Sequence, residues 1–198
     1  MPDEATEKPN YEFLETCFEL SNSLYDLLSN SDFVIALDGA ADRFDGWHEV
    51  IGDMDSIKNS KGLFKDESQD NSDLSKALSK YKVTTVFGID GGRLDHRIGA
   101  FTSLFETKSD AILYFDGWRA CRVPDSGLKM NLNTESNCAL FAFGIVELVT
   151  ISGTEFELKN QNLETGTLGL GNRVKNRVVE ITKSKGDLLF IWEENGHE

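Results

Sequence analysis

Aspartate and glycine occur together at the points where short apolar runs of the sequence end. Three such clusters follow runs that are typical of buried strands, and they span Asp38–Arg43, Gly52–Ser56 and Gly91–His96. A fourth cluster, Gln69–Asp73, comes directly before an amphipathic segment. Because ligands of open α/β sheets bind outside the carboxyl ends of the strands, we expect the polar side chains of these clusters to share one edge of a sheet.

Carboxylates that converge in this way favour a bound cation. Two unit charges about 4 Å apart repel by about 4 kcal/mol at an effective dielectric constant of about 20. The clusters offer oxygen ligands, with no paired cysteine or histidine at zinc spacing, and Mg²⁺ prefers such oxygen ligands. Asp53 and Asp55 lie two residues apart on a turn opened by Gly52, and Asp73 supplies a third carboxylate. We therefore predict a Mg²⁺ site at these three aspartates, which in turn indicates phosphate chemistry.

Each cluster also has a simpler interpretation. Aspartate and glycine form turns, and Asp70 or Ser72 alone would serve as the cap of the following helix.

The Gly91–Arg93 segment favours phosphate binding. Its glycines let the backbone approach a phosphate closely, and the Arg93 guanidinium is a charged donor. His96 is interpreted as a hydrogen-bonding or packing residue at the start of a helix rather than as a base.

The segments between the clusters predict the elements that position them. Strands are predicted for four short apolar runs, at Phe33–Leu37, Glu49–Ile51, Val83–Ile89 and Ala111–Phe115. Helices are predicted for two segments with an apolar face, formed by Leu74, Ala77, Leu78 and Tyr81 in one and by Leu94, Ile98, Phe101 and Phe105 in the other. This alternation predicts a mostly parallel α/β domain over residues 11–118. Residues 1–10 are predicted to be a disordered tail, and Tyr11–Leu28 has a loosely helical pattern.

The pattern changes beyond about residue 118 to alternation and β-branched runs. These runs predict strands at residues 139–143, 145–151, 178–181 and 188–192, without a convincing helix. Gly117, Pro124 and Gly127 lie between the two patterns, so we place a boundary near residues 116–126 and an all-β domain over residues 122–198.

Composition excludes several classes of protein. The chain has 198 residues, with 34 acidic and 20 basic side chains and a formal charge of −14, which argues against nucleic-acid binding by a basic surface. Three cysteines without C-x-x-C spacing suit a reducing compartment. No apolar run approaches membrane-spanning length, and the N-terminus lacks the apolar region of a signal peptide. We therefore expect a cytoplasmic protein that binds neither nucleic acid nor membrane.

The clusters, in this order and at this spacing, resemble those of the thiamine pyrophosphokinase family. The family patterns D-G-G-A-N-R, G-D-x-D-S, Q-D-x-T-D and G-G-R-x-D-H are similar to Asp38–Arg43, Gly52–Ser56, Gln69–Asp73 and Gly91–His96. A weaker match of G-x-K-[WY]-x-L is to Gly153–Leu158, and an S-N pair resembles Gly171-Asn172. The resemblance implies an α/β domain followed by a β-sandwich. It further implies a homodimer, with sites near the subunit interface, that transfers the β,γ-diphosphate of ATP to the hydroxyl of thiamine.

The resemblance also implies roles for individual residues. Mg²⁺ would be held by Asp53, Asp55 and Asp73 against the triphosphate, and Asp70 or Asp73 would orient or deprotonate the attacking hydroxyl. Residues implied to bind the nucleotide are Asp38, Gly39, Asp42, Arg43, Gly91, Gly92, Arg93, Asp95 and His96. Residues implied to bind the acceptor are Gln69, Ser72, Phe156, Gly171 and Asn172, with ordinary packing as the simpler interpretation of Phe156.

The sequence departs from the family pattern at several positions. Ala40 and Asp42 stand in place of Gly and Asn, Glu155 in place of Lys, and Gly171 in place of Ser. The stretch Phe18–Asp32 is too short for the strand, nucleotide loop and helix that the family has there. Two alternatives therefore stay open: a pyrophosphokinase for another hydroxymethyl heterocycle such as a pterin, and a binding homologue without catalysis.

Overall fold

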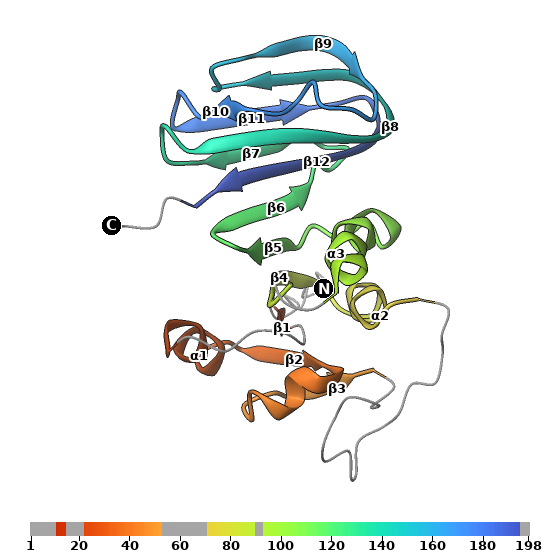
Figure 1. Cartoon of the computed structure of the whole chain (residues 1–198), viewed down its shortest axis with the longest axis vertical. Coiled ribbons are helices and arrows are strands. Elements are labelled where there is room, and N and C mark those ends of the chain that lie inside the picture. Colours follow the sequence, from red (N-terminus) through yellow and green to blue (C-terminus); the bar gives the residue numbers. More distant parts are fainter. Residues whose placement is uncertain (1–10, 15–21, 53–70, 90–92, 195–198) are drawn as a thin grey trace, which may run out of the picture. The chain divides into compact units, whose positions relative to one another are not determined.

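The computed structural model describes residues 11–14, 22–52, 71–89 and 93–194 of the chain (Figure 1). Its contacts divide the chain into two compact units, Met1–Ala111 and Ile112–Glu198, and each unit is described by itself below. The strand expected at Ala111–Phe115 before the domain boundary is observed at Ile112–Phe115 and belongs to the second unit.

The first unit is built on a sheet whose strands were mostly visible as apolar runs in the sequence. Its strands are β1 (Tyr11–Leu14), β2 (Phe33–Leu37), β3 (Glu49–Ile51) and β4 (Val83–Phe87). The order is β3-β2-β1-β4, and each of these neighbours pairs in parallel. Residues 34–37 of β2 are at most 2% exposed, as expected for a strand covered on both faces.

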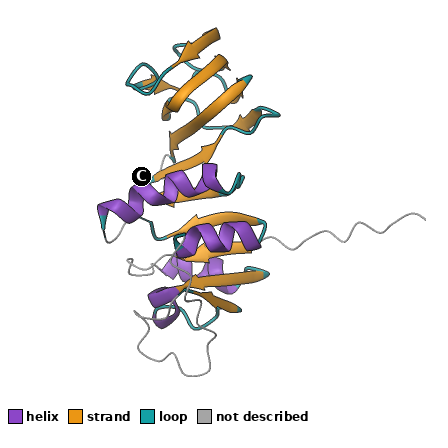
Figure 2. Cartoon of the chain, turned by 90° about the vertical axis from the view of Figure 1, so that its right-hand side faces the viewer, coloured by secondary structure: helices purple, strands orange, loops and turns teal. Residues whose placement is uncertain are grey.

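The helices of this unit follow the strands. They are α1 (Asn22–Ser29), the 3₁₀ helix η1 (Asp38–Asp42), α2 (Asp73–Lys80) and α3 (Leu94–Glu106). Helices α2 and α3 pack side by side (Figure 2, helices in purple). The predicted face of α2 is buried at Leu74, Ala77 and Leu78. The prediction for α3 is wrong at the start of the helix, because Leu94 and Ile98 are 70% and 54% exposed. The residues of α3 that are buried are Ala100, Ser103 and Leu104.

The N-terminal segment also differs from the sequence prediction. Tyr11–Leu28, expected to be loosely helical, contains strand β1 at its start and helix α1 near its end. Strand β1 pairs with both β2 and β4, so it lies inside the sheet. The strand that Phe18–Asp32 is too short to hold is therefore found upstream, at Tyr11–Leu14.

The second unit is made of strands throughout its described part. They are β5 (Ile112–Phe115), β6 (Trp118–Arg122), β7 (Leu128–Asn131), β8 (Asn137–Ser152), β9 (Leu158–Leu163), β10 (Asn172–Arg173), β11 (Val178–Thr182) and β12 (Lys185–Glu193). The two strands predicted at 139–143 and 145–151 are one long strand, β8. It continues through Gly144, whose φ is +81°.

Strand β8 connects the two halves of this β-rich unit. Its first part pairs with β10 and β12, and its second part pairs with β9 and β11. A single hydrophobic cluster includes Leu140 and Val149 from the two parts of β8, together with Ile181 of β11 and Phe190 of β12. The sheet therefore curls around its own core.

Within the described residues of both units, no helix is long and apolar enough to cross a membrane.

Candidate functional site

Gly52 lies where two of the predicted site aspartates meet. Asp38 directly follows β2 and is 8% exposed with a φ of +43°, whereas Gly52 directly follows β3. A Cβ atom added at Gly52 would lie 3.0 Å from the Cβ of Asp38 and 3.0 Å from Oδ2 of Asp73. The φ of Gly52 is +149°, a conformation that residues with side chains rarely adopt. Glycine is thus the residue that lets these two aspartates approach the end of β3.

The oxygen atoms at this point fit a hard cation. Burial of a carboxylate is costly unless hydrogen bonds or an opposite charge compensate it. Oδ1 of Asp38 is buried and accepts no hydrogen bond from the described part of the chain, although the residue makes other interactions. Carboxylate oxygens from Asp38 and Asp73 are the type of ligand that Mg²⁺ binds. The donor chemistry of this strand edge therefore fits the predicted metal.

Part of the predicted site falls outside the described residues. Those positions are Asp53, Asp55, Gln69, Asp70, Gly91 and Gly92. Among the residues that are described, no group of three histidine, cysteine or acidic side chains is arranged to hold a metal ion. The predicted metal set of Asp53, Asp55 and Asp73 thus stays a prediction, with Asp73 as its described member.

Helix α2 presents Asp73 at its first turn. Ser72, predicted to bind the acceptor, is the N-cap, and its Oγ accepts a hydrogen bond from the backbone N–H of Ser75 at 3.1 Å. Oδ1 of Asp73 accepts a hydrogen bond from Nζ of Lys76 at 3.0 Å. Lys76 was not predicted as a site residue, although its position three residues after Asp73 on a helix was the available signal. Its ammonium offsets part of the negative charge at this edge.

Helix α3 begins with an ion pair between two of the predicted nucleotide-binding residues. Arg93 donates to Asp95 through Nη2 at 2.5 Å and through Nε at 3.1 Å. The hydrogen bond from Arg93 lowers the pKa of the Asp95 carboxyl, which also accepts from the backbone N–H of His96 at 3.0 Å. All three side chains are exposed. An incoming phosphate would therefore compete with Asp95 for the guanidinium.

Two further segments complete this end of the unit. Gly39 and Asp42 belong to η1 and Arg43 follows it, and Asp42 and Arg43 are exposed to solvent.

Arg97, which was not predicted, donates from Nε to the carbonyl of Ile89 at 3.3 Å. That contact ties α3 to the chain just after β4, next to the predicted phosphate loop. The only signal for this contact in the sequence was a basic residue in the first turn of the predicted helix.

The predicted acceptor residues of the second unit are joined by hydrogen bonds. The backbone N–H of Phe156 donates to Oδ1 of Asn172 at 3.0 Å, and Nδ2 of Asn172 donates to the Phe156 carbonyl at 2.7 Å. The Phe156 ring is 63% exposed, so it is not part of the core. Gly171 has a φ of +69°, in the left-handed region that favours glycine.

Comparison with known proteins agrees with this arrangement of two units. Residues 24–115 match the family model "Thiamin pyrophosphokinase, catalytic domain", and residues 126–188 match "Thiamin pyrophosphokinase, vitamin B1 binding domain". Among curated proteins, none matches the sequence significantly.

Solved structures share the fold over nearly the whole chain. The thiamine pyrophosphokinase of Bacillus subtilis has a TM-score of 0.77 at 21% identity, covering 94% of this chain and 100% of its own. The enzyme of Candida albicans has a TM-score of 0.77 at 13% identity, covering 94% and 89%. The yeast enzyme has a TM-score of 0.71 at 17% identity, covering 97% and 87%. At these identities the likeness establishes the fold, and the two family models establish the family. The chain belongs to the thiamin pyrophosphokinase family and carries both its catalytic and its vitamin B1-binding domain.

Proposed function

We propose that the protein is a thiamine pyrophosphokinase that transfers diphosphate from Mg-ATP to the hydroxyl of thiamine, giving thiamine diphosphate and AMP. The observation that carries this proposal is the presence of both family domains in one chain, together with the approach of Asp38 and Asp73 to Gly52. A chain that had kept only one of these domains would lack either the phosphate side or the acceptor side of the reaction.

The first unit would bind the phosphate donor. Asp73, with Asp53 and Asp55, would hold Mg²⁺, which supplies charge neutralisation for the triphosphate. Arg93 would exchange its bond with Asp95 for one with a phosphate oxygen, since its guanidinium is exposed and its fork geometry fits both partners. Asp70 or Asp73 would orient the thiamine hydroxyl. Positioning and electrostatic stabilisation supply most of the rate in such transfers.

The second unit would bind thiamine. Asn172 fixes the backbone of Phe156 and leaves its aromatic ring exposed. An exposed ring attracts a cation such as a thiazolium through its π face. Glu155, which stands where the family has lysine, is exposed beside it and adds a negative charge that suits a cationic heterocycle.

We further propose a homodimer in a reducing, cytoplasmic compartment. Strand β8 exposes Phe143, Ile145 and Leu148 near its middle, and such apolar side chains in one strand are typical of protein interfaces. Cys121 and Cys138 are buried and form no disulfide, as is usual in a reducing compartment.

The test is to incubate the protein with Mg-ATP and thiamine and to measure AMP and thiamine diphosphate. We expect both products, in a reaction that requires a divalent metal. AMP formed only with a pterin alcohol would instead indicate another acceptor. Thiamine binding in calorimetry without turnover, under any metal tested, would indicate a binding protein and contradict the proposal.

A further inference from the structure

Helices α2 and α3 meet through polar side chains, whereas packed helices usually meet through apolar ones. We call this set the serine seam, and it consists of Ser72, Ser75, Ser103 and Glu106. Ser75 and Ser103 are 1% and 3% exposed. Glu106 is the last residue of α3, where the helix dipole disfavours a carboxylate. Ser72 is the N-cap of α2, but neither apolar packing nor helix stability explains Ser75, Ser103 and Glu106.

Hydrogen bonds connect all members of the serine seam. Oγ of Ser75 lies 2.8 Å from Oγ of Ser103 and 2.7 Å from Oε2 of Glu106. A hydroxyl has a single proton and a carboxylate only accepts, so Ser75 donates to Glu106. Oγ of Ser72 lies 3.2 Å from that of Ser75 and 3.4 Å from that of Ser103. Because Ser75 gives its proton to Glu106, the bond between Ser75 and Ser103 uses the proton of Ser103, for which the Gly99 carbonyl at 2.9 Å is the competing acceptor. The network is buried at Ser75 and Ser103 and reaches the surface at Ser72 and Glu106, and its hydrogen bonds favour one arrangement of the two helices.

The serine seam ends at the turn that carries Asp73. Ser72 belongs to the seam and is also the N-cap of α2, through its bond with the backbone N–H of Ser75. The next residue is Asp73, whose Oδ2 lies beside Gly52 at the end of β3. A shift of α2 along α3 would carry this carboxylate away from that point. Misplacement of a reacting group by about 1 Å lowers the rate of an enzyme by about a hundredfold.

We propose that Ser75 is a positioning residue for the diphosphate transfer. Its bonds to Glu106 and Ser103 hold the first turn of α2 against α3 and thereby hold Asp73 in place for Mg²⁺. Ser75 is proposed to act through Asp73 and to contact neither the substrate nor the metal. The inference rests on the proposed function, because it assigns Asp73 to that reaction.

The first test measures the Mg²⁺ concentration that gives half of the maximal rate. Ser75→Ala and Glu106→Ala are each expected to raise it about tenfold, as loss of an outer support of a metal site does, with an unchanged KM for thiamine. The double variant should be no worse than Ser75→Ala, because Ser75→Ala already removes the only bond that Glu106→Ala is meant to break. Glu106→Gln keeps an accepting oxygen and should restore the wild-type value. Ser136→Ala, a buried serine of the second unit, is the matched control and should have no effect.

The second test does not depend on activity. Amide hydrogen exchange of residues 73–76 should be about fivefold faster in Ser75→Ala than in the wild type, since the support of that turn is lost. A wild-type protein that forms no AMP would contradict the proposed function alone, and the exchange rates would then decide this inference. Wild-type Mg²⁺ dependence together with wild-type exchange in both variants would overturn it. If Ser75→Ala fails to fold, the same two measurements on Glu106→Ala decide the inference. Glu106 is exposed, so we expect its replacement to leave the protein folded.

Discussion

The side-chain amide of Asn172 binds both backbone polar groups of Phe156. Its Oδ1 accepts from the Phe156 N–H at 3.0 Å and its Nδ2 donates to the Phe156 carbonyl at 2.7 Å. The carbonyl also accepts from Oγ1 of Thr154 at 3.1 Å. Three hydrogen bonds thus fix the backbone of a residue whose ring stays exposed, which is what a preformed binding surface requires.

Asn172→Ala should therefore weaken thiamine binding more than it weakens the fold. Two hydrogen bonds contribute roughly 2 kcal/mol together, so we expect the KM for thiamine to rise about thirtyfold at a nearly unchanged kcat. Asn160→Ala, an exposed asparagine of the same unit that bonds to Thr150, is the control and should leave KM unchanged. Steady-state kinetics with varied thiamine checks this. An equal rise in KM for both variants would argue against a specific role of Asn172.

Gly52→Ala should disrupt the site where Asp38 and Asp73 approach it. The new Cβ would lie 3.0 Å from an atom of each aspartate, at a φ of +149°. We expect a loss of about 1–3 kcal/mol in the free energy of unfolding and a strong loss of turnover. Gly99→Ala is the matched control: nothing lies within 4 Å of its Cβ position, and alanine in a helix should stabilise by about 0.5–1 kcal/mol. Denaturant unfolding compares the two, and an equally tolerated Gly52→Ala would contradict the described geometry.

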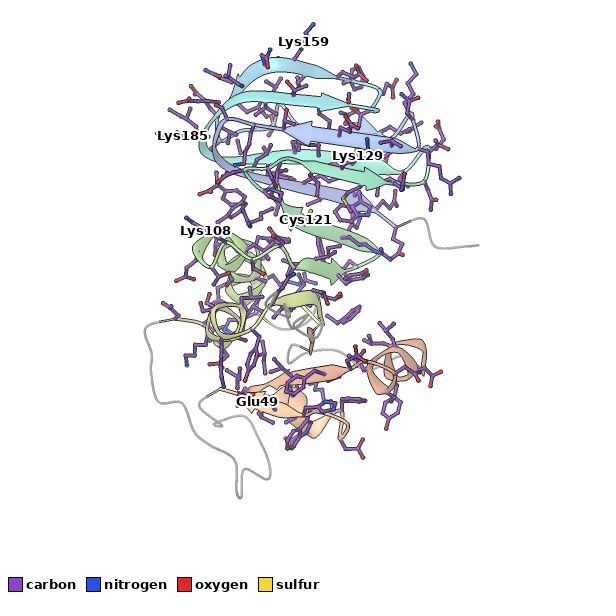
Figure 3. The ribbon with its side chains drawn as sticks, turned by 180° about the vertical axis from the view of Figure 1, so that it is seen from behind. Glu49, Lys108, Cys121, Lys129, Lys159 and Lys185 are labelled. Atoms are coloured by element: carbon purple, nitrogen blue, oxygen red, sulfur yellow. The ribbon has the colours of Figure 1, made fainter. Side chains whose placement is uncertain are left out.

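Glu49 should make stability depend on pH. Glu49, which is labelled in Figure 3, lies at the start of β3. It joins this strand to the end of α2, because it accepts from Nζ of Lys80 at 2.5 Å and from the hydroxyl of Tyr81. Burial alone would raise the pKa of Glu49, but the hydrogen bonds from Lys80 and Tyr81 outweigh it and lower that pKa below its ordinary value. Since the folded pKa is below the unfolded one, this stabilisation is present above the unfolded value and is lost as pH falls through the folded value.

The variant Glu49→Gln should thus unfold at a lower temperature than the wild type at about pH 7, and the difference should shrink as the pH falls through the lowered pKa of Glu49. The pKa of Lys80 is raised, chiefly by its hydrogen bond with Glu49, so its contribution is lost only as pH rises through that raised value. Glu180→Gln breaks an exposed pair with Lys129 and should change little at any pH. Thermal unfolding at several pH values measures both variants. A constant difference between wild type and Glu49→Gln would refute the assigned pairing.

Asp73→Asn should abolish turnover without unfolding the protein. The side chain is 28% exposed, and asparagine keeps its size and its place in the first turn of α2 while losing the charge proposed to bind Mg²⁺. Asp125→Asn, an exposed partner of Lys183 in the second unit, is a control for loss of one carboxylate and should keep full activity. Turnover and circular dichroism of both variants test this. Wild-type turnover in Asp73→Asn would remove that residue from the metal site.

Much of the fold was predictable because burial leaves a pattern in the sequence. The continuous apolar run at Phe33–Leu37 and the spacing of Leu74, Ala77 and Leu78 correctly predicted β2 and α2. Strand β1 was missed because four residues with a charged Glu12 among them carry almost no periodicity. The exposed Leu94 and Ile98 were misread because spacing shows which residues share a helix face, but not whether anything covers that face.

The candidate site was predictable in residue types and less so in contacts. Position after strands marked Asp38, and the resemblance pointed to Phe156 and Asn172. The role of Gly52 could not be foreseen, because it depends on a backbone angle and on two elements that meet only in the fold. The serine seam was missed for the same reason: hydroxyl groups on two helices look like surface residues until the helices face each other.

Diphosphate transfer from ATP to thiamine fixes the stoichiometry of the products. The protein is incubated with Mg-ATP and thiamine, and AMP, ADP and thiamine diphosphate are quantified together. We expect one AMP for each thiamine diphosphate, no ADP, and no reaction after the metal is chelated. Formation of ADP with thiamine monophosphate, or the absence of any thiamine product, would contradict it.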